Sequence, residues 1–441
     1  MRFFRYKKKI NKTAVVKTSA IFMAAVFVIG GIRFGMSSNP EAEFGKTVDE
    51  FYKEENLQVA GELESSNESD LDVSNEQVTL GSNDLDIKAK SAVLMDAGTK
   101  TVLYEQNGDE KLPPASITKI MTMLLSMEAI DRGQISLEDQ VVVSDRAASM
   151  GGSQMYMESG ETHTVEELMK GICMVSANDG AVAMAEYLCG SVEIFVEKMN
   201  ARAKELGMLN TNFVNTNGLP VADHYTSAKD IAIMGCELMK HEKTHEWMTK
   251  WQDTVMVGLE GKQKEFGLTN TNKLIKQYHG ANGIKTGFTQ EAGYCLAGSA
   301  TREDMTLVAV VLGCEDSKVR FAETGRLLDY GFANYDNVFI AEKGESNGLM
   351  PIEKGRDEFV DAVAAEDICL LVKKGQKDGV RCEAVTKESL KAPIKKGDTI
   401  GEIVVYMEDK EVSRYPLVAA KDVEKANIFQ IYKRMLLSLI E

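Results

Sequence analysis

Three short motifs in the sequence hold the residue types needed for attack on a carbonyl group. Ser116-Ile-Thr-Lys119 is its only S-x-x-K, Lys285-Thr-Gly287 is its only K-T-G, and Ser176-Ala-Asn178 lies between them. A serine hydroxyl is a poor nucleophile until a base removes its proton. At positions i and i+3 of one helical turn, Ser116 and Lys119 face the same way, so the lysine can be that base. We therefore predict an active site with Ser116 as nucleophile.

The second lysine completes this chemistry. Lys119 can act as a base only when it is neutral, and burial together with a nearby cation lowers the pKa of an amine. Lys285 is the expected cation. A helix that begins at Ser116 directs its free N–H groups toward the reacting carbonyl. On a strand, Lys285 and Gly287 share one face, and the glycine leaves room for a peptide along the strand edge.

The elements that must position these motifs can be placed from the hydrophobic pattern. Two pairs of strands are expected, at 91–95 with 101–104 and at 293–300 with 305–312. Helices are expected from Ser116, across 164–190 with Ser176-Ala-Asn178 inside, and from Ser227, where Ser227 and Asp230 have capping-box spacing. Helices in the middle and strands at both ends predict an α/β (α+β) fold, in which chain-distant strands close one sheet.

The chain divides into five parts. We predict a signal peptide or signal anchor at 1–36, a disordered acidic spacer at 37–86, a catalytic domain at 87–333, a small β domain at 334–420 and an amphipathic helix at 421–441. The β domain rests on short strands at 368–371, 400–406 and 411–416. In the last part, an apolar stripe predicts either packing on the β domain or, as we favour, a helix lying on a membrane surface. Its members are Ile428, Ile431, Tyr432, Met435, Leu436 and Leu439, with Lys433 and Arg434 off the stripe.

The N-terminus indicates export. Seven Lys and Arg residues in 1–17 precede an apolar run from Ala20 to Ile32, which is short for a membrane span. The spacer that follows carries fourteen acidic residues and two lysines, a composition that cannot bury enough apolar surface to fold. Whether or not the signal is cleaved, we expect the rest of the chain on the outer face of the bacterial cytoplasmic membrane.

Composition excludes several other classes of protein. A net charge of −16 argues against nucleic-acid binding. Seven dispersed cysteines without C-x-x-C predict buried free thiols rather than disulfides or zinc ligands. No glycine-rich nucleotide loop is present, and no cofactor or metal is expected. His241-Glu-Lys-Thr-His245 matches the zinc-peptidase pattern H-E-x-x-H, but its charged neighbours favour a solvated surface.

The motifs and their neighbours resemble the low-molecular-mass penicillin-binding proteins, specifically the serine-type D-alanyl-D-alanine carboxypeptidases. The resemblance rests on Leu112–Lys119, Val175–Asp179 and Gly283–Thr289, with supporting stretches at Met150–Ser153, Phe213–Leu219, His224–Ser227 and Val319–Phe321. It covers roughly residues 86–440 and implies an antiparallel sheet flanked by helices, followed by the β domain and the terminal helix. It also implies a membrane-associated enzyme of peptidoglycan metabolism that β-lactams inhibit.

The family resemblance also implies a role for each site residue. Ser116 attacks the penultimate D-Ala carbonyl of a peptidoglycan stem peptide, and Lys119 takes its proton. Ser176 relays a proton to the leaving D-Ala, Asn178 holds the substrate amide and Lys285 balances the charge. Gly287 keeps the strand face clear. The implied ligands of the terminal carboxylate are Thr286 and Arg320, and the implied oxyanion donors are the backbone N–H groups of Ser116 and Phe288.

Two alternatives use the same motifs. A class A β-lactamase needs a glutamate for deacylation, and the nearest candidate, Glu205, has one residue too many before Asn210 for the E-x-x-L-N pattern. A penicillin-binding sensor that is acylated without turnover would keep every motif, and only kinetics separates it from a hydrolase.

Overall fold

The computed structural model describes residues 85–387 and 390–437, with side chains as far as Tyr432. The predicted signal and nearly all of the predicted spacer lie outside the described residues. Leu85, which the prediction placed at the end of the spacer, is buried in the first domain, and its carbonyl accepts a hydrogen bond from Tyr104 at 2.6 Å. The ordered chain therefore begins before residue 87.

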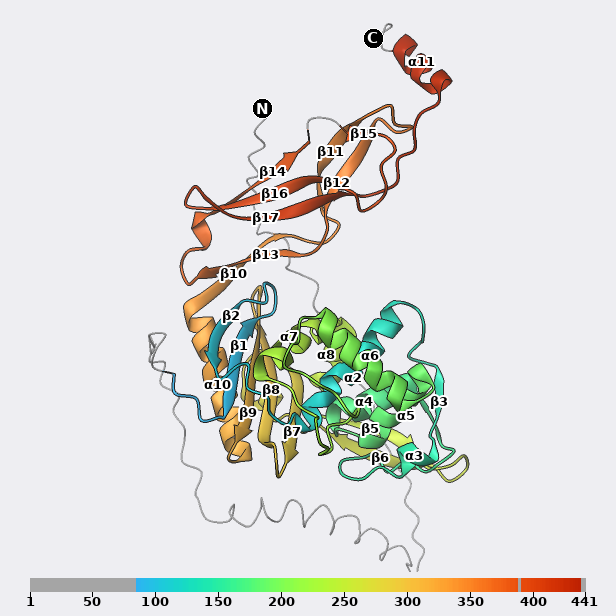
Figure 1. The fold of residues 1–441 in the computed structure, drawn as a ribbon, viewed down its shortest axis with the longest axis vertical. Helices are drawn as coiled ribbons and strands as arrows, with labels where there is room; N and C mark the ends of the chain where they lie inside the picture. Colours follow the sequence, from blue (N-terminus) through green and yellow to red (C-terminus); the bar gives the residue numbers. More distant parts are fainter. Residues whose placement is uncertain (1–84, 388–389, 438–441) are drawn as a thin grey trace, which may run out of the picture. The chain divides into compact units, whose positions relative to one another are not determined.

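A five-stranded antiparallel sheet in the order β2-β1-β9-β8-β7 forms the centre of the first domain (Figure 1). Its strands are β1 (Ser91–Asp96), β2 (Val102–Gln106), β7 (Ala281–Thr289), β8 (Gly293–Arg302) and β9 (Met305–Cys314). Strands far apart in the chain meet because β1 pairs with β9, with Ser91 opposite Leu312. The predicted fold class and the β8–β9 hairpin are confirmed. Strand β7 lies at the edge of this sheet.

Alternate residues of each strand supply two separate cores. Val93 and Val310 pack on the face covered by most of the helices, whereas Leu94 and Ala309 pack on the face covered by α10 (Ser317–Asn334). Figure 1 shows α10 and α7 (Ala228–Leu238) on opposite sides of the sheet. This two-sided burial explains why the central strands read as almost continuous apolar runs.

The remaining helices and small strands lie between β2 and β7 in the chain. They are η1 (Ala115–Thr118), α2 (Lys119–Asp131), β3 (Gln140–Val142), α3 (Asp145–Ala148), β4 (Thr162–Thr164), α4 (Val165–Met174), α5 (Asn178–Cys189), α6 (Val192–Glu205), α8 (Glu242–Met248), β5 (Gln252–Val257), β6 (Lys264–Thr269) and α9 (Leu274–Gln277).

Three predicted helix details differ from the structure. Ser116 lies in a 3-10 turn, and the α-helix begins only at Lys119. The predicted helical region 164–190 is two helices, because Ser176 adopts a φ of 64° that no α-helix can contain. Ser227 caps α7 by accepting from the Asp230 N–H, but the Asp230 carboxylate binds Asn210 and Thr211, so only half of the capping box forms.

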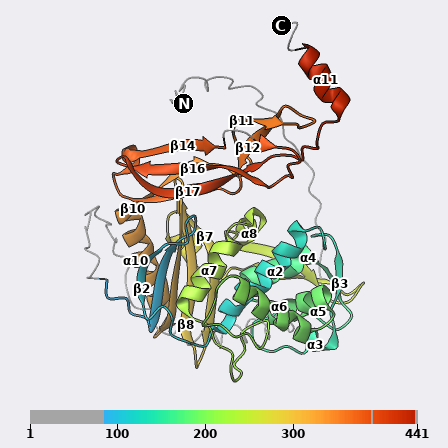
Figure 2. The ribbon, with the colours of Figure 1, turned by 45° about the horizontal axis from the view of Figure 1, so that its top comes forward.

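The second domain is all-β, as predicted. A six-stranded sheet in the order β14-β16-β17-β12-β11-β15 accompanies the β10–β13 pair (Figure 2). The elements are β10 (Tyr335–Ala341), β11 (Ser346–Glu353), β12 (Phe359–Ala364), β13 (Ile368–Lys373), η2 (Lys377–Gly379), β14 (Val380–Thr386), β15 (Leu390–Lys391), β16 (Thr399–Met407) and β17 (Lys410–Ala419). The Asn337 side chain bonds Asp96 at 2.7 Å and joins this domain to strand β1.

The last described element is helix α11 (Ile428–Leu437), so the terminal segment is helical as predicted. The helix begins later than residue 421, because Val423 is buried in the core of the β domain. Among the described residues, no helix is both long and apolar enough to cross a membrane. All seven cysteines are free thiols, as predicted. The predicted burial is found for four of them, Cys173, Cys236, Cys295 and Cys314, whereas Cys189 and Cys369 are half-buried and Cys382 is exposed.

Candidate active site

The hydroxyl of Ser116 and the amine of Lys119 are in contact. Lys119 Nζ lies 3.0 Å from Ser116 Oγ and donates to the Asn217 carbonyl at 2.9 Å. The Ser116 hydroxyl forms no helix-capping hydrogen bond. It therefore remains available for chemistry. The S-x-x-K spacing therefore places a base on the hydroxyl even though the turn is 3-10 rather than α.

Both motif lysines are buried in the sheet–helix interface. Burial lowers the pKa of Lys119 well below its ordinary value, Lys285 lowers it further, and Asp179 opposes the shift. Burial likewise lowers the pKa of Lys285 to about 8. Because the protein removes Lys119 from water and keeps a second cation near it, Lys119 is set up as a neutral amine beside Ser116.

The K-T-G motif lies on the edge strand β7, close to the nucleophile. A Cβ atom at Gly287 would lie 3.1 Å from Ile117 Cγ1 and 3.2 Å from Pro114 O, so the absence of a side chain lets β7 approach the turn that carries Ser116. No described strand pairs with the outer edge of β7. That edge can hydrogen-bond an extended peptide.

The S-x-N motif presents two buried polar atoms without partners. Ser176 Oγ and Asn178 Oδ1 have no hydrogen-bond partner, although both residues are almost fully buried. Asn178 is held in place by its Nδ2, which donates to Gly151 O at 2.7 Å. Buried polar atoms normally find partners, so these two are suited to bind groups of a ligand.

Arg320, which comes from α10, contacts strand β7, and Thr286 is a residue of that strand. Arg320 Nη1 donates to Gly287 O at 3.1 Å, while its buried Nε has no partner. Thr286 Oγ1 pairs with Thr271 Oγ1 at 2.8 Å. A guanidinium and a hydroxyl are groups that can bind a carboxylate, as predicted for Arg320 and Thr286.

Phe288 differs from the other motif residues because its side chain points outward. It is 49% exposed and stacks on Tyr294, with ring centroids 4.3 Å apart. Only the backbone of Phe288 is therefore available as a hydrogen-bond donor at this position.

Sequence reasoning assigned no role to three residues that hold the motifs. The buried Asp179 carboxylate accepts from the N–H groups of Met155, Met157 and Gly180, and so fixes the loop over Asn178. Thr271 bridges to the K-T-G strand as described, and no sequence signal marks it. Asp179 could have been found as the charged residue that directly follows Ser176-Ala-Asn178.

The third positioning residue is His224. Its Nδ1 accepts from Val214 N at 2.9 Å, so Nε2 carries the proton and donates to Thr118 Oγ1 at 2.8 Å. Thr118 in turn donates to Ala115 O, which stabilises the turn before Ser116, where Ala115 has a φ of 46°. Burial lowers the pKa of His224 to about 4, so the ring is neutral at physiological pH.

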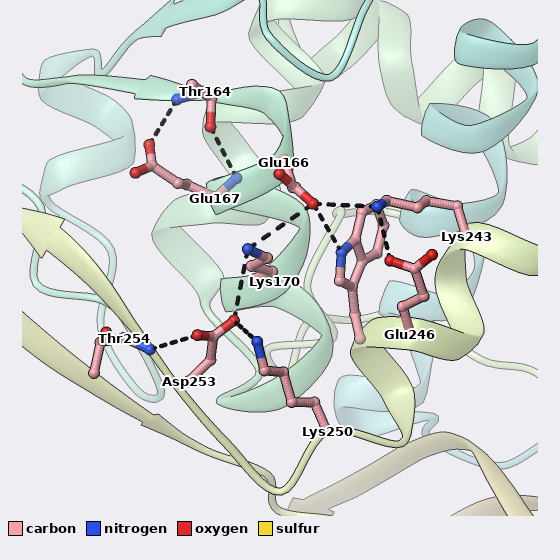
Figure 3. A network of polar contacts seen from close by, with 10 residues as sticks. Thr164, Glu166, Glu167, Lys170, Lys243, Glu246, Lys250, Asp253 and Thr254 are labelled. Carbon is pink, nitrogen blue, oxygen red and sulfur yellow. Dashed lines mark hydrogen bonds and ion pairs between the residues drawn. The ribbon is translucent and has the colours of Figure 1, made fainter. Parts of the chain in front are cut away.

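The H-E-x-x-H stretch does not form a metal site among the described residues. His241 bonds Asp131 at 2.7 Å, and the His245 ring bonds Met239 O. Figure 3 shows that charged residues of α8 form ion pairs: Lys243 pairs with Glu166 of α4 and with Glu246 of its own helix.

The rest of that surface network ties α4 to β5. Lys170 lies 3.9 Å from Glu166 and 3.5 Å from Asp253, and Lys250 also binds Asp253 at 2.8 Å (Figure 3). The stretch is a charged surface, as its neighbours indicated.

The β-lactamase candidate Glu205 is also removed from the site. It ends α6, its side chain is 64% exposed, and it pairs with Arg202 at 3.0 Å. It cannot activate a water beside Ser116 from that position.

A half-buried serine in a 3-10 turn against a buried lysine at the start of a helix, close to an edge strand with K-T-G and a loop with S-x-N, defines a serine acyl-transfer enzyme of the penicillin-binding type. The sequence profile of the D-alanyl-D-alanine carboxypeptidase family matches residues 77–316, and that of the penicillin-binding protein 5 C-terminal domain matches residues 335–425. The chain belongs to the D-alanyl-D-alanine carboxypeptidase family.

Named relatives and solved structures agree with this assignment. The chain is 44% identical to the D-alanyl-D-alanine carboxypeptidase DacF of Bacillus subtilis over 79% of this chain and 89% of the relative. It is 33% identical to DacC of Escherichia coli, over 78% and 86% respectively. Its fold is similar to that of penicillin-binding protein 5 from Haemophilus influenzae, with a TM-score of 0.63, 31% identity, and coverage of 77% of this chain and 98% of the other.

Proposed function

We propose that this protein releases the terminal D-Ala from peptidoglycan stem peptides ending in D-Ala-D-Ala, through an acyl-enzyme on Ser116, and that β-lactams acylate the same serine. The observation that carries the proposal is the 3.0 Å contact between Ser116 Oγ and the buried Nζ of Lys119. Burial and Lys285 lower the pKa of this amine, which favours its neutral, basic form.

In the acylation step, the Ser116 hydroxyl transfers its proton to neutral Lys119 as Oγ bonds to the penultimate D-Ala carbonyl carbon. The oxyanion forms between the backbone N–H groups of Ser116 and Phe288. Lys285 keeps a positive charge near the developing negative charge. The C–N bond then breaks as Ser176 relays to the leaving D-Ala nitrogen the proton that Lys119 took from Ser116. Water hydrolyses the resulting ester, which restores the serine.

The same groups explain why a C-terminal peptide is required. The free carboxylate binds Arg320 and Thr286, and the outer edge of β7 pairs with the peptide backbone. Asn178 Oδ1, which lacks a partner, accepts the N–H of a substrate amide. Gly287 was predicted to leave room for the peptide; instead, it lets strand β7 pack against the turn that carries Ser116.

The direct test is to incubate the protein with a peptide ending in D-Ala-D-Ala and measure free D-Ala, with fluorescent penicillin labelling in parallel. We expect stoichiometric labelling and continuous release of D-Ala. Labelling with no release beyond one equivalent would show the non-turnover sensor instead. Absence of both would overturn the proposal.

We also propose that the protein is exported and works at the outer face of the cytoplasmic membrane, held by its N-terminal segment and by α11. The basic and apolar pattern of residues 1–36 supports export. Three aromatic or aliphatic side chains of α11 support membrane contact, since Ile428 is 76% exposed, Phe429 81% and Tyr432 63%. If Ile428 and Tyr432 packed on the β domain, their side chains would be largely buried, and they are not. The predictions for Lys433, Arg434, Met435 and Leu439 concern side chains outside the described residues.

Flotation with anionic vesicles tests the helix. A chain spanning Leu85–Glu441 should float, one ending at Asn427 should not, and both should release D-Ala equally, because both chains keep the buried residues Leu85 and Val423. Equal behaviour of the two chains with vesicles would leave the N-terminal segment as the anchor. The exposed apolar residues of α11 would then need another partner.

A further inference from the structure

Strand β14 lies at one edge of the six-stranded sheet of the β domain (Figure 2). It pairs with β16 over its whole length, from Val380 to Thr386, without a register shift. No described strand pairs with its other side. The strand contains neither a proline nor a bulge, two of the devices that keep an edge strand from pairing with another chain. β14 can therefore accept one more strand.

The hydrogen bonds at the two ends of β14 show which backbone groups face its free side. Gly379 O accepts from Glu408 N at 3.1 Å, and Lys387 N donates to a β16 carbonyl at 3.4 Å. Hydrogen-bonded pairs alternate with non-hydrogen-bonded pairs along an antiparallel ladder. The odd-numbered residues of β14 therefore bond to β16, whereas Cys382 and Ala384 direct their N–H and C=O groups outward.

The side chains of β14 carry one charge of each sign, two residues apart. Arg381 and Glu383 lie on one face of the strand and pair with each other, although 48% and 37% of their side chains are exposed. Cys382 lies between them and is exposed, whereas the other six cysteines are buried or half-buried. The order cation, thiol, anion is its own charge complement when a second copy of the strand runs antiparallel to the first.

We propose that β14 pairs antiparallel with β14 of a second copy of this chain, about a two-fold axis at Cys382. In this register, Arg381 of each copy lies opposite Glu383 of the other, where opposite charges stabilise a strand pair. The N–H and C=O groups of the two Cys382 residues bond each other, and Ala384 N donates to Val380 O of the second copy. The two six-stranded sheets become one continuous sheet.

Charge selects this register over its neighbours. Because only the even-numbered residues direct backbone groups outward, β14 can shift along its copy only in steps of two residues. One step brings the two Glu383 side chains opposite each other, and a step the other way does the same for Arg381. Like charges directly opposite each other destabilise a strand pair. The strand therefore matches its own copy in one register.

The proposed interface is small. Two short strands bury much less than the roughly 1,200–2,000 Å2 of a stable complex, so the pair dissociates readily in dilute solution. Detection of the dimer therefore needs a covalent trap, and Cys382 provides one at the centre of the interface. Hydrogen-bonded cross-strand residues have Cα atoms about 5.5 Å apart, which a short thiol-reactive linker spans. Their Cβ atoms are farther apart than a direct disulfide prefers.

A short bis-maleimide, added to the full-length chain, tests the pairing. We expect a covalent dimer on a denaturing gel for the unmodified protein and none for Cys382→Ser. Glu383→Arg should lower the yield of dimer at least about 10-fold, because it places cations opposite each other at two symmetric positions. The exchange of both charges, Arg381→Glu with Glu383→Arg, should restore the yield.

Two further variants separate strand pairing from a general effect of charge. Ala384→Pro should abolish the dimer, since proline removes an outward N–H and leaves every bond to β16 in place. Glu353→Arg is the matched control, because Glu353 is an exposed glutamate of β11, near the opposite edge of the same sheet. It should cross-link like the unmodified chain. Thermal unfolding of each variant checks that it is folded.

The absence of a covalent dimer in the unmodified protein would overturn the proposal. Equal yields from Glu383→Arg and the unmodified chain would also overturn it, because the linker would then join chains that do not pair through β14. Neither result bears on D-Ala release, so the proposed function stands or falls separately.

Discussion

The two domains differ in where they keep their polar groups. In the catalytic domain, Ser176 Oγ, Asn178 Oδ1 and Arg320 Nε are buried without partners, and two lysines are almost fully buried. In the described part of the β domain, buried polar side chains occur only at Asp336 and Asn337, where the domain begins, and its core is apolar. Asn337 Oδ1 is the buried side-chain atom without a partner among the described residues of the β domain. Such atoms reduce stability, and in the catalytic domain three of them belong to residues of the predicted site.

Backbone conformation follows the same division. Positive φ angles at non-glycine residues occur at Ala115 and Ser176, directly beside or within the catalytic motifs. In the β domain, they occur at exposed turn residues such as Lys354 and Asp409. Strained backbone angles therefore lie beside the predicted site in the first domain and at surface turns in the second. We expect matched substitutions to reduce activity in the first domain and to leave it unchanged in the second.

The largest effect is expected at the nucleophile. Ser116→Ala should lower D-Ala release by roughly five to six orders of magnitude and abolish penicillin labelling, because no other hydroxyl has a neutral amine against it. Ser126→Ala is the control, since Ser126 is a serine buried in α2 that bonds the Thr122 carbonyl and lies outside the predicted site. Full labelling of Ser116→Ala by a folded protein would contradict the assignment.

Next in size is the effect of the general base. Lys119→Arg keeps the positive charge but cannot become neutral, so acylation by penicillin should nearly vanish. In the unmodified enzyme, acylation should rise with pH as Lys119 loses its proton through its lowered pKa. It should fall again above about pH 8, where Lys285 loses the charge that supports the oxyanion. A flat acylation rate between about pH 6 and 9 would rule out the lysine base.

Replacing one arginine in each domain compares the kinetic importance of the two domains directly. Arg320→Gln should reduce kcat/KM for D-Ala release about 10- to 100-fold, mainly through KM, as expected for losing charged hydrogen bonds to a carboxylate. Arg414→Gln removes contacts to Glu402 and Glu411, and Arg414 lies on the surface of the β domain with 51% of its side chain exposed. It should change neither D-Ala release nor the thermal midpoint. Comparable kinetic losses in both variants would show that the β domain takes part in catalysis.

The smallest effect on activity is expected from the β-domain core. Leu417→Ala should lower the free energy of unfolding of that domain by about 2–5 kcal/mol, because the side chain is fully buried among apolar neighbours. D-Ala release should stay unchanged at temperatures where the domain remains folded. Thermal unfolding and D-Ala release, measured on the same sample, check the two halves of this prediction. A parallel drop in both would mean that the domains are functionally coupled.

Much of the site follows from residue spacing. Ser116 and Lys119 share a face in a 3-10 turn as in an α-helix, so the contact was predictable although the helix start was not. The β8–β9 hairpin follows from the hydrophobic pattern and the turn residues, whereas the edge position of β7 appears only in the structure. The break at Ser176 could not be predicted, because the surrounding pattern is helical and only packing against the loop bound by Asp179 decides it.

The sequence by itself determined which residue types perform the chemistry, their order and the two-domain division, because motif spacing and hydrophobic period are local properties of the chain. Only the tertiary structure decided how those residues act. The neutral state of Lys119 depends on burial and on Lys285, which is far away in sequence. His224 reaches Thr118 across 106 residues, and Thr271 reaches the K-T-G strand across a loop. Such contacts and the pKa shifts they cause depend on distances in space and on exclusion of water, which no local pattern encodes.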